Sequence, residues 1–338
     1  MAKRIWAAFI GASIALGFAT GAGAETVTAR VGVIPVVGAA PLFVAEKKGW
    51  LHDAGLDLAT TVFESGPNAI QAAASGNIDI YVAGVAPLAV GRARGVDLTV
   101  VAATAVDENV LVAGPKLKAF FKDGVAPAAA FKAFRAANGR PAKIATQPPS
   151  SVPAANLQYW LREATHTDLA DVEIISIGID ATQQALLAGA VEAATVREPT
   201  LTIVQQRNPN IVLLAKGEEL FPGQPGTVVA VSKGFAQKHP QAVQALVSGI
   251  VRAVAELQTK PDETAPLVEA ALSKGIVDSA TIRKSLSSPA VRFVADPQAI
   301  VDSTKALLAF QVTLGAIDKA PNTDGLFDRS FFETASKR

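Results

Sequence analysis

The chain has 338 residues, of which half are apolar and 18% are charged. It contains no cysteine, which excludes disulfides, thiolate metal sites, cysteine nucleophiles and a lipid-modified cysteine. The formal charges nearly cancel, with 31 basic and 30 acidic residues. Because no basic cluster longer than two residues follows the N-terminal region, we expect no nucleic-acid partner.

The first 24 residues are typical of a cleaved secretory signal peptide. Lys3 and Arg4 precede an apolar run over residues 5–18, and Ala22-Gly23-Ala24 matches a small-x-small cleavage signal. The alternative, a retained membrane anchor, is disfavoured because the apolar run is short for a bilayer span. We therefore expect a periplasmic protein without a lipid anchor, starting at Glu25 and 314 residues long (338 minus 24), with a net charge of −1 (29 basic, 30 acidic).

Short β-branched runs alternate with helical patterns in the first part of the remaining chain, which is typical of an α/β fold with mostly parallel strands. The predicted strands are 27–34, 58–63, 78–82 and 98–103, and the predicted helices between them are 41–54, 67–75 and 87–94.

A similar order returns after an Ala/Lys/Phe-rich insert that carries a predicted helix over 127–138. Strands are predicted over 143–145, 172–177 and 191–196, with helices beginning near Ser150 or Ser151, at Asp180 and at Pro199. After a strand over 227–232, only helical patterns follow, to residue 314.

Two stretches of the chain form a weak internal repeat. Pro67–Gly76 and Asp180–Gly189 have equal length, and each precedes a strand that carries an acid near its start, Asp79 and Glu192. The repeat predicts two similar lobes, with lobe one formed by residues 25–111 and 226–338 and lobe two by residues 112–225. The alternative is that any two βαβ units look alike at this level.

Catalytic and metal-binding patterns are absent from the sequence. The three histidines, His52, His166 and His239, lie far apart, and none has a second ligand at a metal-binding interval. Phosphate-binding and nucleophile-elbow glycine motifs are missing as well. We expect no catalysis, no metal and no cofactor.

Small residues and proline instead recur where predicted strands end and helices begin. In a parallel sheet these loops lie at one edge, where ligands of open α/β sheets bind and where helix N-termini favour anions. The alternative for each loop is ordinary turn punctuation. The candidate ligand-binding residues are Val37, Gly38 and Ala39; Ser65, Gly66 and Pro67; Gly84, Val85 and Ala86; Ser150, Ser151 and Val152; and Arg197 and Glu198.

Arg197 is the most specific single candidate for ligand binding, because a charge at the end of a buried strand needs a partner. Its guanidinium could hold a carboxylate or sulfonate in a two-pronged grip, or pair with Glu198 or Asp180. Glu198 could bind a ligand amine, cap the next helix or bridge the lobes. The serines could act as helix caps, as hydroxyl donors to a ligand, or as both.

Several of these segments resemble the nitrate/sulfonate/taurine solute-binding proteins of ABC importers, a group that includes aliphatic-sulfonate-binding and thiamine-pyrimidine-precursor-like proteins. The resemblance rests on residues 41–50 (PLFVAEKKGW), 55–57 (GLD), 65–67 (SGP), 74–79 (ASGNID), 143–151 (KIATQPPSS), 188–194 (AGAVEAA) and 198–199 (EP). One departure is Arg197, where family members often have tryptophan.

The resemblance implies a two-lobed, type II-like periplasmic-binding-protein fold with two mixed, mostly parallel sheets, a two-strand hinge and a ligand in the cleft between the lobes. It implies a monomer that delivers a small solute to a membrane permease and its ATPase. Since the candidate loops lack Trp and Tyr, a sulfonate, carboxylate or similar oxyanion fits best.

Two other readings remain open at this point. One is a ligand-sensing periplasmic subunit of a signalling receptor. The other is an enzyme of the same fold, but the related desulfinases need a nucleophilic cysteine and the pyrimidine synthases a cysteine-rich iron site, and this chain has no cysteine.

Overall fold

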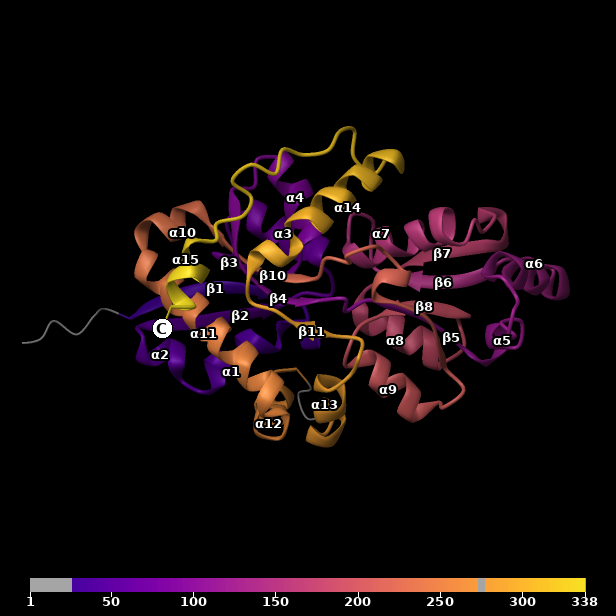
Figure 1. Cartoon of the computed structure of the whole chain (residues 1–338), viewed down its shortest axis with the longest axis horizontal. Helices are drawn as coiled ribbons and strands as arrows, with labels where there is room; N and C mark the ends of the chain where they lie inside the picture. Colours follow the sequence, from indigo (N-terminus) through magenta and orange to yellow (C-terminus); the bar gives the residue numbers. More distant parts are fainter. Residues whose placement is uncertain (1–25, 273–276, 338) are drawn as a thin grey trace, which may run out of the picture.

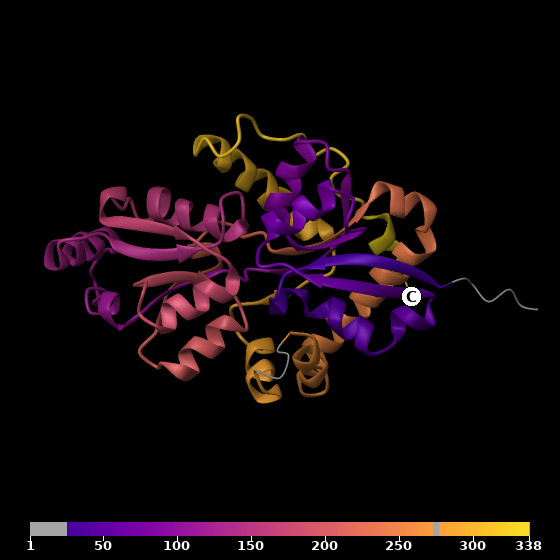
Figure 2. The ribbon, with the colours of Figure 1, turned by 180° about the vertical axis from the view of Figure 1, so that it is seen from behind.

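The computed structural model describes residues 26–272 and 277–337, so the predicted signal peptide lies outside the described residues. Two β-sheets, each covered by helices on both faces, lie end to end along the longest axis of the molecule (Figure 1). The reverse view shows the same two halves, with the helices over residues 279–286 and 301–313 on the side of the first half that faces the second (Figure 2).

The first sheet has six strands in the order β11-β4-β10-β3-β1-β2. Strands β1 to β4 run in the same direction, and β10 and β11 oppose them. The bounds are β1 Val27–Val33, β2 Leu56–Val62, β3 Ile80–Gly84, β4 Leu98–Val106, β10 Thr227–Ser232 and β11 Arg292–Phe293.

Helices cover both faces of this sheet because its strands are apolar on both sides. On β3, Ile80 and Val82 face one apolar cluster while Tyr81 and Ala83 face another. The first cluster includes side chains of α1 (Ala40–Lys47), α2 (Trp50–Asp53), α11 (Pro240–Thr259), α12 (Pro261–Leu272), α13 (Ser279–Leu286) and α15 (Ser330–Ala335). The second includes side chains of α3 (Gly66–Ala74), α4 (Val85–Ala93) and α14 (Val301–Thr313).

The second sheet has five strands in the order β7-β6-β8-β5-β9, with β5 opposed to the other four. Its strands are β5 Val110–Ala113, β6 Ala142–Thr146, β7 Val172–Ser176, β8 Ala193–Val196 and β9 Val212–Lys216. Helices α5 (Pro115–Lys118), α6 (Pro127–Asn138) and α7 (Val152–Tyr159) cover one face, and α8 (Ile179–Leu187) and α9 (Thr200–Arg207) the other. Both sheets are mixed and mostly parallel, as predicted.

The chain crosses between the sheets twice, at residues 107–109 between β4 and β5 and at residues 217–226 between β9 and β10. The expected lobe boundary between residues 111 and 112 falls inside β5, which pairs in the second sheet. The expected boundary at residue 226 falls at the end of the second crossing. The crossings place two antiparallel connections side by side between the halves.

The predicted internal repeat corresponds to a repeated local structure. In the first half Asp79 accepts hydrogen bonds from the backbone N–H of Arg30 on β1 (3.0 Å) and from its side chain (2.9 and 2.7 Å). In the second half Glu192 accepts from the backbone N–H of Lys143 on β6 (2.8 Å) and from Arg140 (3.1 and 2.7 Å). These hydrogen bonds lower the pKa of Asp79 and, against the effect of burial, that of Glu192.

The C-terminal segment departs from the expectation of helices alone. Residues Arg292–Phe293 add strand β11 to the edge of the first sheet by pairing with β4. From α10 (Lys233–Lys238) onward, the remaining elements pack mainly on the first half. Two of them also reach the second half, since α13 packs against α9 and α14 against α7. Among the described residues, no helix combines the length and apolarity needed to cross a membrane.

Candidate functional site

Three of the predicted loops meet where the strand ends of the two sheets face each other. The loop after β1 forms a 3-10 turn over Val37–Ala39, and all three of its residues are buried. The backbone N–H of Val37 donates a hydrogen bond to the carbonyl of Glu198 at the end of β8 (2.8 Å). The halves are thus joined directly at this point.

Arg197 lies at this junction with its guanidinium buried. Its Nη1 is 3.7 Å from Oε1 of Glu108, and only 3% of the Arg197 side chain and 1% of the Glu108 side chain are exposed. Its Nε donates to Oδ1 of Asn109 (2.8 Å). The expected structural partners, Glu198 and Asp180, were wrong, because the partners come instead from the crossing between β4 and β5.

Glu108 and Asn109 also tie this crossing to the second one. Thr227, at the start of β10, donates from Oγ1 to Oε1 of Glu108 (2.6 Å). Gln224 accepts from the backbone N–H of Asn109 (2.7 Å) and donates from Nε2 to the Asn109 carbonyl (3.2 Å). Arg197 is therefore attached to a buried polar network that runs through both connections between the sheets.

Some hydrogen-bonding capacity in this network is unused. Nη1 of Arg197 and Oε2 of Glu108 are buried and have no hydrogen-bond partner among the described residues. Oε2 of Glu108 lies over Gly38, where an added Cβ would be 2.0 Å from it. The absence of a side chain at Gly38, a candidate ligand-binding residue, thus makes room for Glu108.

Glu198 serves the start of α9. Its carboxylate accepts hydrogen bonds from the backbone N–H and the hydroxyl of Thr202 (both 3.1 Å), so Glu198 caps the start of α9, as one of the alternatives predicted. Burial raises the pKa of Glu198, and hydrogen bonds from Ser288, Thr202 and Ser285 act in the opposite direction. Because Ser285 and Ser288 belong to the C-terminal segment, Glu198 also links the two halves.

The loop after β3 contacts the start of α7 in the other half. An added Cβ on Gly84 would be 3.0 Å from the Val152 side chain and 3.6 Å from Nη2 of Arg197. The Gly84 carbonyl accepts a hydrogen bond from the Tyr81 hydroxyl (2.8 Å), and burial raises the pKa of Tyr81. Tyr81 is therefore a neutral donor that holds this loop in place.

A small cavity of about 10 Å³ lies beside Arg197, large enough for about one water molecule. Its polar lining groups come from the second half, and its lining is Val36, Gln147, Ile179, Thr182, Thr195, Val196, Arg197 and Thr200. Sequence reasoning missed the glutamine and the three threonines. Thr195 gave a usable signal, since it is a polar residue inside an otherwise apolar strand.

A model of the NMT1-like family matches residues 22–272, which is most of the chain. The chain belongs to the NMT1-like family.

The chain is also similar to curated proteins over about two thirds to three quarters of its length. The chain is 28% identical over 240 residues to the bicarbonate transport ATP-binding protein CmpC of Synechocystis, covering 69% of this chain but only 35% of that protein. It is 26% identical to a putative binding protein of Brucella abortus, covering 76% and 75% of the two chains.

Two solved structures share its fold. The nitrate-binding protein NrtA of Synechocystis superposes with a TM-score of 0.75 at 17% identity, covering 93% of this chain and 89% of that one. The alkanesulfonate-binding protein SsuA of Xanthomonas axonopodis gives 0.71 at 19% identity, covering 91% and 100%. The expected periplasmic-binding-protein fold is thereby confirmed.

The other candidate residues of this NMT1-like chain act mainly as helix starts. Ser65 and Ser151 are the N-caps of α3 and α7, and their hydroxyls accept from Asn68 N–H and Ala154 N–H (both 3.3 Å). Gly66 packs against the Tyr81 hydroxyl and precedes Pro67 in the first turn of α3. These contacts place the loop after β2 beside β3.

Three further candidates lie at other points of the junction. Val85 and Ala86 form the first turn of α4 and are buried, and Ala86 packs with Val152 in an apolar cluster shared by the two halves. Ser150 has a left-handed backbone (φ 67°) and donates to the Pro149 carbonyl (2.6 Å). Ser150 does not line the cavity at Arg197 described above.

The chemistry of the junction favours binding. Among the described residues no group of three or more histidine or acidic side chains could hold a metal ion. The side chains around Arg197 are threonine hydroxyls and the amides of Gln147 and Asn109, with the Glu108 carboxylate 3.7 Å from Nη1. Such a set can surround a small anion with hydrogen bonds.

Proposed function

We propose that this protein is the solute-binding subunit of an ABC importer and holds a small anion between its two halves. The observation that carries the proposal is Arg197, a buried cation whose Nη1 has no hydrogen-bond partner within residues 26–272 and 277–337, beside a cavity whose lining includes three threonines and a glutamine. A carboxylate, sulfonate or similar oxyanion would accept from these donors. The buried Glu108 then has a second role, balancing the charge of Arg197 when no anion is bound.

The relatives support an anion as the solute. Their names include a bicarbonate-binding protein from Synechococcus (24% identical, covering 69% of this chain and 55% of that protein) as well as the nitrate- and alkanesulfonate-binding proteins described above. Bicarbonate, nitrate and alkanesulfonate each carry a compact negative charge. Delivery to a membrane permease and its ATPase, and a periplasmic location, follow from the same likeness and form part of the proposal.

Binding requires the two halves to separate, because the cavity at Arg197 is only about 10 Å³. We propose that residues 26–106 and the chain from residue 227 on form one lobe and residues 110–216 the other, with the two crossings as hinge. The boundary expected at residues 111–112 is thus moved to the start of β5, which pairs in the second sheet. The ligand enters the opened cleft, and closure brings Val37, Gly84 and Val152 over it. Small-angle scattering should show a smaller radius at saturating ligand, and an unchanged profile at proven saturation contradicts hinge closure.

The proposed site binds and releases its ligand unchanged, as a monomer without metal or cofactor. Arginine does not act as a base near neutral pH, and Glu198 is engaged by Thr202. Incubating the chelator-treated protein with its tightest ligand and following that ligand by mass spectrometry tests this. Steady conversion above the buffer control would refute it.

The experiment for the proposed site is a thermal-shift screen of residues 25–338 with nitrate, bicarbonate, small sulfonates and small carboxylates, followed by calorimetry. Saturation at 100 times the dissociation constant stabilises the folded state by about 2.7 kcal/mol. Arg197→Ala should weaken binding by about 2–5 kcal/mol, and Arg197→Lys should restore part of it. Arg207→Ala, which removes an exposed arginine on α9, is the control. Unchanged affinity in Arg197→Ala would place the ligand elsewhere.

A further inference from the structure

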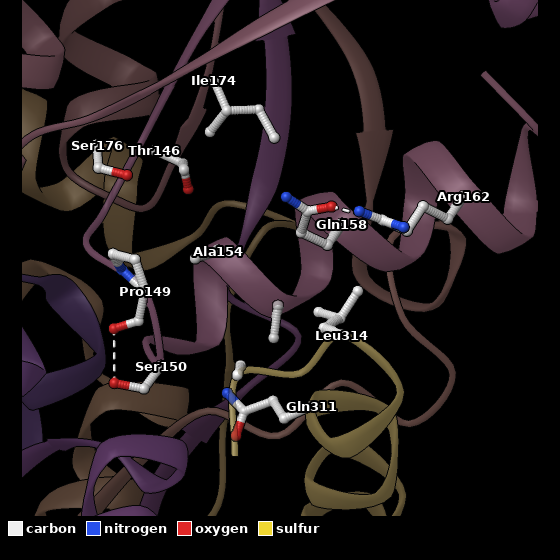
Figure 3. A pocket seen from close by; sticks show the side chains of 12 residues that line it. Thr146, Pro149, Ser150, Ala154, Gln158, Arg162, Ile174, Ser176, Gln311 and Leu314 are labelled. Atoms are coloured by element: carbon white, nitrogen blue, oxygen red, sulfur yellow. Dashed lines mark hydrogen bonds between the residues drawn. The ribbon is translucent and has the colours of Figure 1, made fainter. Parts of the chain in front are cut away.

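A second, larger pocket lies away from Arg197, where α7 meets the C-terminal end of α14 (Figure 3). Its volume is about 170 Å³, and none of its lining residues lines the cavity at Arg197. The second half contributes the ends of β6 and β7 and one side of α7. The first half contributes Gln311, Leu314 and Ala316 from α14 and the turn after it.

Arg162 is the one charged residue among those that line this pocket. Its Nε donates to Oε1 of Gln158 (2.9 Å), and among the described residues it forms no ion pair. Its two terminal nitrogens are therefore available to an anion. Because no acid lines the pocket, nothing there would repel one.

Gln311 supplies a buried polar group on the opposite wall. The residue is 1% exposed, and its Oε1 has no hydrogen-bond partner among the described residues. Figure 3 shows its side-chain amide at the edge of the pocket, on the side of Ser150. A buried amide oxygen without a donor is unfavourable, so a ligand whose O–H or N–H group donates to Oε1 of Gln311 gains affinity.

The rest of the lining is largely apolar. Ile174 and Leu314 face the pocket together with Pro149, Ala154 and Ala155. A cavity of about 150 Å³ holds a benzene molecule, so this pocket has room for a ring or a short hydrocarbon chain. Thr146, Ser150 and Ser176 add hydroxyl groups to this lining. One charged residue and a mostly apolar wall with a few hydroxyl groups suit an amphiphilic ligand.

We propose that this pocket is a second binding site, distinct from the cleft at Arg197, for a small amphiphilic organic anion. Its carboxylate or sulfonate pairs with Arg162, its hydrocarbon part packs between Ile174 and Leu314, and a hydroxyl or N–H group at its other end donates to Oε1 of Gln311. Because Gln311 and Leu314 belong to the first half and Arg162 to the second, an occupant favours the arrangement in which the halves are in contact.

The probe is benzoate, with benzamide as its neutral counterpart of similar shape. Titrations of the ¹⁵N-labelled protein, residues 25–338, should show saturable shifts at the amides of Ala154, Ala155 and Ala316 with benzoate. Benzamide should bind at least 10-fold more weakly, because it cannot pair with Arg162. Absence of saturable binding at millimolar benzoate, or equal affinity for the two compounds, overturns the proposal.

Variants separate this site from the central cleft. Arg162→Ala should weaken benzoate binding at least 10-fold. Gln311→Leu, which keeps the side chain's size, should weaken binding of 4-hydroxybenzoate several-fold, because the hydroxyl of that ligand can donate to Oε1 of Gln311, and should leave benzoate affinity nearly unchanged. Arg207→Ala is the matched control for loss of an exposed arginine from the same half. If Arg197→Ala abolishes benzoate binding while Arg162→Ala leaves it intact, the probe occupies the central cleft and the second site is refuted. If Arg197→Ala retains the shifts at Ala154 and Ala316, the second site stands whatever the central ligand is.

Discussion

The buried pair between Glu108 and Arg197 should make a large contribution to stability that one substitution can expose. Glu108→Gln keeps the size of the side chain and an oxygen to accept from Thr227, but it removes the charge opposite Arg197. At 3.7 Å and an effective dielectric constant of about 20, the lost Coulomb attraction is about 4.5 kcal/mol. Breaking a buried pair from one side costs about 3–5 kcal/mol in general, so we expect a loss in this range.

Urea denaturation followed by tryptophan fluorescence measures this loss, since Trp50 and Trp160 report on the two halves. The matched control is Asp97→Asn, which breaks the pair between Asp97 and Lys233. That pair has nearly the same separation, 3.8 Å, but its side chains are 56% and 63% exposed. Solvent screening should keep the cost of Asp97→Asn below about 1 kcal/mol.

A double-mutant cycle completes the test. In Glu108→Gln combined with Arg197→Met neither charge is left buried alone, so the double variant should be more stable than the sum of the single losses predicts. If Glu108→Gln costs no more than Asp97→Asn, or if the two single losses simply add, the pair is not desolvated in solution. The reasoning from burial would then be wrong.

Three further predictions concern the junction and its surroundings. Gly38→Ala places a Cβ 2.0 Å from Oε2 of Glu108 and should lower the free energy of unfolding, measured in urea, by about 1–3 kcal/mol. Gly234→Ala is the control, because its Cβ meets no atom within 4 Å and should leave stability unchanged or raise it. Equal effects of the two substitutions would contradict the packing argument. Burial raises the pKa of Glu198, so its ionisation should reduce wild-type stability as pH rises from about 4.3 through the raised pKa. Over the same interval, the stability of Glu198→Gln relative to wild type should rise. A stability difference that does not depend on pH would refute the raised pKa of Glu198. Phe310→Ala removes a ring packed edge-on against Tyr159 of α7, with 5.3 Å between the ring centroids. It should lower the free energy of unfolding by about 3–5 kcal/mol and increase the radius of gyration measured by small-angle scattering. Lower stability with an unchanged radius of gyration would show that this contact does not hold the halves together.

The arrangement of strands and helices could be predicted largely from local pattern. Short apolar runs with breaks at glycine and proline indicated most strands of both sheets. Side chains alternate between two faces every second residue in a strand and return to one face about every 3.6 residues in a helix, so the order of apolar residues distinguishes the two. The helix at Pro127–Asn138 was predicted with its observed bounds, since Pro127 suits its first turn and Gly139 (φ 68°) ends it in a left-handed conformation. Strands β5 and β9 were missed although they are as long as β8 and β6, which were predicted, and the two-residue β11 was missed as well.

The sequence also predicted which loops lie at the junction between the halves, but it did not predict which residues contact each other there. Loops at the carboxyl ends of parallel strands must share an edge, which is why Val37, Gly84, Val152 and Arg197 were chosen together and lie together. The partner of Arg197 is Glu108, which belongs to the crossing between sheets and carries no motif.

Local sequence therefore determined the α/β elements, their order and the edge where the loops gather, since these depend on side-chain periodicity and turn chemistry. Only the tertiary structure decided which groups face one another across the junction. It paired Arg197 with Glu108, filled Gly38's space with a carboxylate, and placed Gln311 in the pocket that Arg162 also lines. Such contacts depend on how two sheets and a returning C-terminal helix dock, and no local pattern along the chain encodes the distances that result.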